Sequence, residues 1–391
     1  MDERVCAASG RGLARASLPL LALLPVAGAA AGQRAHLVRM GASAVLDAEA
    51  LQPLRPHGER GLLGSSSAGE VLFAATPGPL VPSMDQAPGP LGPGWRMCVI
   101  PPASRSVAPV RDAPLCPLAV SRRAPAIWVA AAEGLSRVAN DRATRAGQAL
   151  WVGQGAVDLG VLVSADTPAL GATGPLPVLE LTVDRSGLIW SLADGSVACF
   201  ADEPAALVAT GFGIGPASAA LGVHPRERVW LYTAAGPPDQ PAQLRRLRAE
   251  GSGVGFRIAE ADSLPDLPRL AEARIVPTLD GRLILAGQTL AGDLLVEVVS
   301  GVVRSQAIPP ALTHGRRVTA VDVDQEGCVY LATDGAGVLT YREGEWGVHP
   351  ITEHLPVLEG SDLKPVDDIL VTDDGTLHAA CQFQVVIWKP D

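Results

Sequence analysis

Short apolar runs separated by polar turns recur along this chain. Residues 318–346 begin with the run VTAVDVD, pass through the turn QEG into a second apolar run, CVYLAT, and reach a third run after another glycine turn. Residues 178–203 follow the same order, and three positions correspond: Asp184 with Asp324, Gly187 with Gly327, and Trp190 with Tyr330. Runs of this length between glycine turns predict short β-strands rather than helices.

This unit of strand, turn and strand has further copies, at residues 65–76, 123–138, 220–236, 273–287 and 366–381. One residue in the second strand marks each unit: Leu72, Trp128, Trp190, Trp230, Ile284, Tyr330 and His378. The markers lie on average about 51 residues apart, and a period of roughly 40–50 residues with four short strands is typical of β-propeller blades. The sequence therefore predicts an all-β fold, a seven-bladed β-propeller of four-stranded antiparallel blades.

The predicted propeller gives each strand a place. The first strand of a unit should line the central channel. The second strand, apolar on both faces, should lie between neighbouring blades with its marker residue in the core. We expect one propeller domain over residues 33–391. A strand at 35–40 should close the ring by pairing with the unit that contains VDDILVT and VVIWKP, because an unpaired seam would leave strand edges open.

The clearest copy of the unit resembles a known repeat. The resemblance is carried by Asp324, Gly327, Tyr330, Gly337, Tyr341 and Trp346. Their order and spacing are similar to the two-component-regulator propeller repeat of bacterial sensor ectodomains, and residues 178–200 match the same pattern well. The resemblance implies a bacterial propeller of the ligand-binding sensor type, which in that family usually precedes a membrane helix and a kinase. Such repeats specify a fold more than a function.

Composition excludes some functions. Glycine (42 residues) and proline (34) are spread over the whole chain of 391 residues, as many turns require. The net charge is −10, and Lys364 and Lys389 are the only lysines, so we expect no binding to nucleic-acid phosphates. No apolar run reaches the roughly 20 residues that a transmembrane helix needs.

The N-terminal residues have two interpretations. Arg11 and Arg15, an apolar centre at 18–26 and small residues at 29–31 follow the order of a secretory signal. Residues 1–32 are therefore either a signal peptide or an N-terminal strand of the propeller. Export to the periplasm or the cell exterior is slightly favoured over a cytoplasmic location.

Cysteine usage leaves the compartment open. Cys98 and Cys116 flank a proline-rich segment and could pair in an oxidising compartment. Cys199, Cys328 and Cys381 lie in apolar runs, where we expect buried thiols.

Residues 322–327, DVDQEG, look like part of a calcium loop, with carboxylates at the first, third and fifth places and glycine at the sixth. Thr333 stands at the twelfth place, where such a loop needs a bidentate glutamate. The equivalent turns of other units, DRSG and HPRE, keep the turn but lose the acids. We therefore interpret the segment as a blade turn, and we expect no metal site and no cofactor.

Two other segments are interpreted as loops. HPITEHLP, with His349, Glu353 and His354, contains prolines that prevent a helix from aligning these side chains, so a solvated loop is expected. The glycine-rich segment GFGIGP at 211–216 is not followed by a helix of the kind that a dinucleotide site needs.

The longest loops point to one face of the propeller. Proline-rich insertions follow the second strand of a unit at 76–95 and 234–242, on the face shared by the links between blades. The candidate ligand-binding residues on this face are His314, Arg316, Arg317, Asp334 and Asp194.

The predicted function is non-catalytic recognition or scaffolding. A monomer would bind a protein partner, a small ligand or a glycan on the loop face. The alternative is a propeller-fold enzyme, a lyase or hydrolase, that acts at the mouth of the channel. Because no His and carboxylate motifs converge in the sequence, the binding module is favoured and no catalytic residue is assigned.

Overall fold

The chain is described by a computed structural model over part of its length. The described residues are 34–39, 61–66, 68–75, 96–100, 108–109, 117–122, 124, 126–131, 134–139, 142–146, 178–184, 186–193, 196–200, 207–213, 218–224, 228–234, 240–250, 257–357, 361–381 and 384–390. The expectations for residues 1–32, for the pairing of Cys98 with Cys116 and for Asp194 lie outside what the structure describes.

Most of the described residues are in strands, and every strand except the short β26 (Lys364–Pro365) has one of four positions in a small antiparallel sheet. The inner strands are β2 (Gly61–Ser65), β6 (Pro117–Val120), β10 (Val178–Val183), β14 (Ser218–His224), β18 (Ala271–Pro277), β22 (Val318–Val323) and β27 (Asp368–Val371). The second strands are β3 (Val71–Ala75), β7 (Ile127–Ala131), β11 (Ile189–Ala193), β15 (Arg228–Ala234), β19 (Leu283–Thr289), β23 (Val329–Gly335) and β28 (Leu377–Cys381).

The remaining strands lie further from the centre. The third strands are β4 (Arg96–Ile100), β8 (Gly134–Ala139), β12 (Ser196–Phe200), β16 (Ala242–Glu250), β20 (Gly292–Val299), β24 (Val338–Arg342) and β29 (Gln384–Lys389). The outer strands are β5 (Ala108–Pro109), β9 (Arg142–Ala146), β13 (Leu207–Gly213), β17 (Arg257–Leu267), β21 (Val302–Ala307), β25 (Glu345–Val348) and β1 (Arg34–Arg39).

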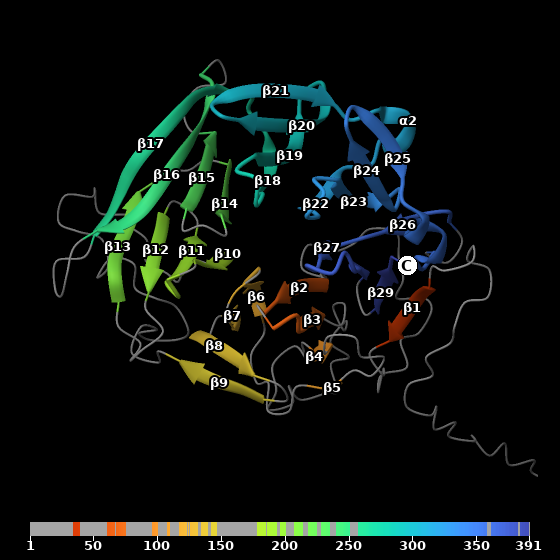
Figure 1. Ribbon diagram of the computed structural model, residues 1–391, viewed down its shortest axis with the longest axis horizontal. Coiled ribbons are helices and arrows are strands. Elements are labelled where there is room, and N and C mark those ends of the chain that lie inside the picture. Colours follow the sequence, from red (N-terminus) through yellow and green to blue (C-terminus); the bar gives the residue numbers. More distant parts are fainter. Residues whose placement is uncertain are drawn as a thin grey trace, which may run out of the picture.

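The small sheets are arranged radially around a common axis, as in a β-propeller (Figure 1). Their inner strands contact one another in a closed circle, in the order β2, β6, β10, β14, β18, β22, β27 and back to β2. Apolar clusters fill the space between adjacent sheets. In one of them, Ala332 and Val338 of one sheet pack with Leu377, Val386 and Trp388 of the next. A small sheet covers its two faces in this way only by packing between neighbours.

The ring is closed by the two ends of the described chain. Strand β1 pairs antiparallel with β29, with Arg34 opposite Lys389 and Arg39 opposite Gln384. One sheet therefore contains an N-terminal strand and three C-terminal strands, in the order β1, β29, β28, β27. The predicted closing strand at 35–40 is thus confirmed, and it satisfies the outer edge of β29.

The second strands form the core, as predicted. The seven marker residues each lie in the second strand of a different sheet, and all but Tyr330 are buried. Trp128 and Trp190 are among the largest fully buried side chains. The predicted buried thiols Cys199, Cys328 and Cys381 are buried.

The glycine turns between inner and second strands also match the prediction. Gly187 and Gly327 have φ of +85° and +86°, and each donates its N–H to the carbonyl of the aspartate three residues earlier, at 3.0 and 3.2 Å. A positive φ in this range strongly favours glycine. The turn is therefore the constant part of the unit.

The prediction of loops is partly wrong for two segments. Gly211 to Gly213 of the segment GFGIGP belong to strand β13. The segment HPITEHLP contains η4 (Pro350–His354), a short 3-10 helix. His349 precedes this helix and caps it, because its Nδ1 accepts the N–H of Ile351 at 3.1 Å. The ring of His349 packs edge-on against Tyr330 and Trp388 instead of facing solvent. A proline at the start of a short helix is compatible with helical geometry, and this accounts for the error.

Among the residues that the structure describes, no helix has the length and apolar character needed to span a membrane.

Candidate functional site

The ring has two faces, which we name by their connections. At the turn face, each inner strand joins its second strand, and in five of the described sheets this turn contains a glycine with positive φ. At the link face, one sheet connects to the next and the second strand joins the third. Three additional elements lie at the link face: α2 (Pro310–Thr313), η4 and the short strand β26 (Lys364–Pro365), which pairs with the end of β23.

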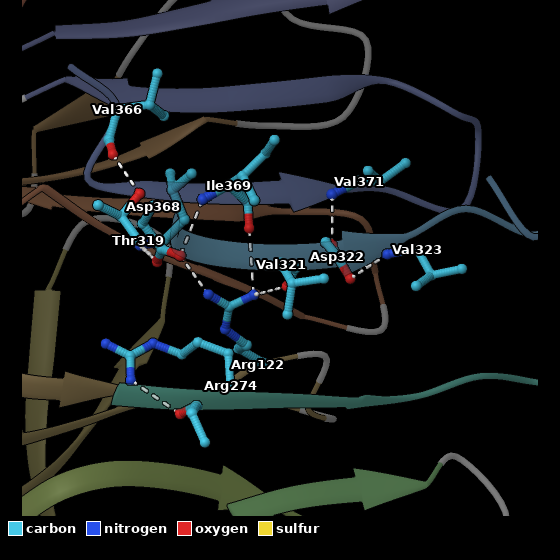
Figure 2. A network of polar contacts seen from close by, with 12 residues as sticks. Arg122, Arg274, Thr319, Val321, Asp322, Val323, Val366, Asp368, Ile369 and Val371 are labelled. Carbon is cyan, nitrogen blue, oxygen red and sulfur yellow. Dashed lines mark hydrogen bonds and ion pairs between the residues drawn. The ribbon is translucent and has the colours of Figure 1, made fainter. Parts of the chain in front are cut away.

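Arg122 is the centre of a polar network on the ring axis (Figure 2). Its Nη1 donates to the carbonyl oxygens of Ile369 at 3.2 Å and Val321 at 3.5 Å, and its Nη2 pairs with Asp368. Arg122 follows β6, whereas its partners lie on β22 and β27, which are not neighbours of β6 in the circle of inner strands. One guanidinium therefore connects sheets on different sides of the axis.

Carboxylates on three of the inner strands connect their sheet to the next one in the circle. Asp368 accepts the N–H of Leu63 at 2.8 Å, and Asp322 accepts the N–H of Val371 at 2.7 Å. Glu180 accepts the N–H of Leu221 in the same way. Inner strands have an unpaired edge, so these carboxylates satisfy backbone donors that the sheet itself leaves open.

The electrostatics of the network follow from burial and from these contacts. Burial alone would lower the pKa of Arg122, but the nearby charges of Asp368, Asp322 and Glu180 outweigh burial and raise it. Burial raises the pKa of Glu180, and the charge of Arg274 with the N–H of Leu221 offsets only part of that effect. Arg122 thus stays charged, and Asp368 balances its charge directly.

A cavity of about 700 Å³ lies on the axis, and we call it the axial cavity. Inner strands of every described sheet contribute to its wall, so the prediction that first strands line the channel is confirmed. Its rim includes exposed residues of the turn face, among them Ala68, Leu279 and Gln325. Its size is in the range of small-molecule sites.

The predicted link-face residues are partly brought together. Arg317 Nη1 donates to both carboxylate oxygens of Glu272, at 3.1 and 3.2 Å, and Arg317 Nε lies 3.7 Å from Asp334 Oδ2. The N–H of Asp334 donates to the carbonyl of Arg317 at 3.0 Å. Arg316 and His314 are exposed beside them, and His314 ends α2 with a left-handed φ of 51°.

The three acids of DVDQEG have separate partners. Asp322 is buried and bonds to β27, and Glu326 forms an exposed ion pair with Arg342 at 3.0 Å. Asp324 accepts the N–H of Cys328 at 2.8 Å and the Tyr330 hydroxyl at 3.0 Å. In the described part of the chain, His, Cys, Asp and Glu side chains form no group of three or more that could hold a metal ion.

The sequence interpretation missed the axial network. The sequence feature that could have revealed this network is a charged residue within an otherwise apolar first strand. Glu180, Arg274 and Asp368 each stand four residues before the first residue of their turn, where the chain begins its bend at Asp184, Thr278 and Thr372. Arg122 has no equivalent in the repeat, and only the closed ring brings it to its partners.

Comparisons with known proteins bear on the fold only. No protein-family model matches the sequence, and no curated protein gives a significant match. Among solved structures, YCF48 bound to D1 peptide aligns with a TM-score of 0.51 and 10% identity, over 86% of this chain and 94% of that chain. At this identity the likeness shows the fold alone.

Two further structures align less closely. The extracellular domain of a one-component system of B. thetaiotaomicron has a TM-score of 0.47 and 10% identity over 85% of this chain, which spans only 39% of the length of that chain. The structure of streptogramin B lyase has a TM-score of 0.49 and 12% identity, over 91% of this chain and 98% of that chain.

Proposed function

We propose that residues 33–391 form a single seven-bladed β-propeller that acts, as a monomer, as a non-catalytic binding module. Its protein partner or small ligand binds at the link face, around Arg316 and Arg317. The closed circle of inner strands supports the propeller, and the β1 to β29 pairing supports its closure within one chain.

One observation supports the link face as the binding surface. All the described helical turns, α2 and η4, and the additional strand β26 lie on the link face of one sheet and its neighbours. Lys364 of β26 donates its ammonium N–H to the carbonyl of Thr352 in η4 at 2.9 Å, so these elements support one another. Repeat proteins add structure to the face that binds, because the opposite turns must stay short.

The chemistry of this face suits an acidic or polar segment of a partner. Arg316, Arg317 and His314 are exposed together, and the ion pair of Arg317 with Glu272 is open to solvent. Exposed ion pairs contribute little to stability, so a partner's carboxylate can replace Glu272 at small cost. The YCF48 structure holds a peptide, and we take from it only that a scaffold of this fold can present a peptide-binding surface.

The enzyme alternative would use the mouth of the channel. The axial carboxylates are engaged in holding the ring: Asp368 accepts two backbone N–H groups as well as Arg122, and Asp322 accepts two backbone N–H groups. A carboxylate with this many partners is suited to a structural role more than to proton transfer. The binding module therefore remains the better supported function.

Site-specific photo-crosslinking tests the proposed face. A photoreactive amino acid is placed at Arg316 on the link face or at Glu326, an exposed residue of the turn face of the same sheet. We expect the variant at 316, and not that at 326, to crosslink a defined partner in the native host. Crosslinks of equal yield from both positions, or from 326 alone, would reject the link face.

A further inference from the structure

The axial cavity has an excess of acidic groups. Its wall contains three basic side chains, Arg122, Arg274 and Lys389. It contains seven acidic side chains, Glu180, Asp184, Asp322, Asp367, Asp368, Asp373 and Asp374. Arg122 is already paired with Asp368, and acidic side chains still outnumber basic ones among the rest of the lining. Walls of low dielectric strengthen such a field and concentrate cations.

A second, independent feature of the cavity is an unpaired histidine nitrogen. His378 lines the cavity from β28, and its side chain is buried, with 4% relative exposure. Its Nδ1 has no hydrogen-bond partner among the described residues. A buried polar atom without a partner is unfavourable, and a ligand group that bonds to it would remove this cost. Burial lowers the pKa of His378 to about 4, so the ring is uncharged at neutral pH and does not repel a cation.

The lining of the cavity also includes buried apolar side chains. Leu63, Val71, Ile100, Leu370 and Ile387 belong to it, and each is at most 4% exposed. They belong to the cluster between the sheet of β27 and the sheet of β2. Charged residues of the neighbouring turn, Asp373 and Asp374, form the adjoining rim. The surface therefore offers an aliphatic wall, a hydrogen-bonding nitrogen and carboxylates.

We propose that the axial cavity binds a small organic cation, a primary aliphatic amine, whose alkyl chain lies against the apolar wall and whose ammonium group is held by the carboxylates and by His378. The opening at the turn face admits it. This site is separate from the partner surface proposed for the link face, and it uses none of the same residues. A bare metal ion fits less well, because no three ligating side chains of the described chain converge.

Calorimetric titration of the full chain with cadaverine tests the proposal. We expect saturable binding to one site that weakens with added salt, and no binding of glutarate, a dianion of the same chain length. Replacement of Asp373 by Asn at the exposed rim should weaken cadaverine binding roughly threefold, and His378→Phe should weaken it about tenfold. Glu343→Gln, an exposed acid outside the cavity wall, is the matched control and should bind as the parent does.

A second measurement reads His378 directly and does not depend on a variant that folds. In the full chain with ¹⁵N-labelled histidine, cadaverine should shift the Nδ1 resonance of His378 with the same concentration dependence as the calorimetric signal. Absence of binding, equal binding of glutarate, an unchanged Nδ1 resonance at saturation, or equal losses in Asp373→Asn and Glu343→Gln would each overturn the proposal. The link-face crosslinks are independent of all these outcomes.

Discussion

Nε1 of Trp190 donates a hydrogen bond to Oδ2 of Asp184, six residues earlier in the chain, at 2.8 Å. Tyr330 and Asp324 have the same relationship in another sheet, where the Tyr330 hydroxyl donates to Asp324 Oδ2 at 3.0 Å. In both turns the second carboxylate oxygen accepts the N–H four residues ahead. The aspartate thus ties the turn to the second strand, which explains its place in the repeat without a metal.

Removal of the Tyr330 hydroxyl tests this role. Tyr330→Phe deletes one donor and leaves the Asp324 carboxylate with one partner fewer, so we expect the free energy of unfolding to fall by about 1–2 kcal/mol. Urea denaturation measures it. Tyr341→Phe deletes a hydroxyl from a half-exposed ring on the same sheet and should change stability by less than about 0.5 kcal/mol. Equal losses in the two variants would show that the bond to Asp324 contributes nothing specific.

The Arg122 and Asp368 pair should be among the most sensitive positions of the ring. Arg122→Met leaves Asp368, which is buried, without its cationic partner, and we expect a loss of about 3 kcal/mol in the free energy of unfolding. Arg248→Met, which breaks an ion pair with Glu250 on the outer part of another sheet, should lose at most about 1 kcal/mol. A loss at Arg122 no larger than that at Arg248 would contradict a role in holding the ring.

If β1 closes the ring, truncation of the N-terminal residues that form it should expose β29. Removal of residues 1–39 takes away β1 and exposes the edge of β29, so amide protons of β29 should exchange faster and thermal stability should fall. Removal of residues 1–32 alone keeps β1 and is the matched control. Hydrogen exchange read by mass spectrometry compares the two, and equal protection of β29 in both would reject closure by β1.

Histidine burial predicts an acid-sensitive fold. Burial lowers the pKa of His349 from 6.5 to about 4. Between these values the unfolded chain takes up a proton that the folded chain does not, so this contribution to stability is complete above about pH 6.5 and decreases as the pH falls toward 4. Burial acts in the same direction on His378.

His349→Gln keeps an acceptor for the N–H of Ile351 but cannot be protonated. We expect the melting temperature of this variant to change less between pH 7 and pH 5 than that of the parent chain. His314→Gln, at an exposed residue, should keep the parent's dependence. A parent-like slope in His349→Gln would be evidence that this ring does not contribute.

The repeat could be predicted from the sequence because local patterns determine it. The sequence alone is enough to recognise the turn glycines with positive φ, such as Gly187 and Gly327. The same holds for buried marker residues such as Trp128 and Trp190. The closing strand was also predictable, since a ring with an open seam would leave the outer edge of β29 unpaired.

The axial network could not be predicted from the same patterns. Asp322 was visible in the sequence, but as a member of a calcium-like loop with Asp324. Asp322 lies in strand β22 and bonds to β27, whereas Asp324 begins the turn after β22 and bonds within that turn and to Tyr330, so the two carboxylates have different partners. The contact between Arg122 and Asp368 joins residues 246 positions apart and exists only in the closed ring. Likewise, His349 was expected in solvent because its ring contacts come from residues distant in the sequence: Tyr330 of β23 and Trp388 of β29, which belongs to the next sheet.

The most direct test of the proposed binding face is the affinity of the crosslinked partner, once purified, for charge-reversed variants. Arg316→Glu reverses an exposed charge on the link face, and Arg342→Glu reverses an exposed charge at the turn face of the same sheet. We predict that Arg316→Glu weakens binding about tenfold or more while Arg342→Glu binds as the parent does. Parent-like binding by Arg316→Glu, with weakened binding by Arg342→Glu, would contradict recognition at the link face.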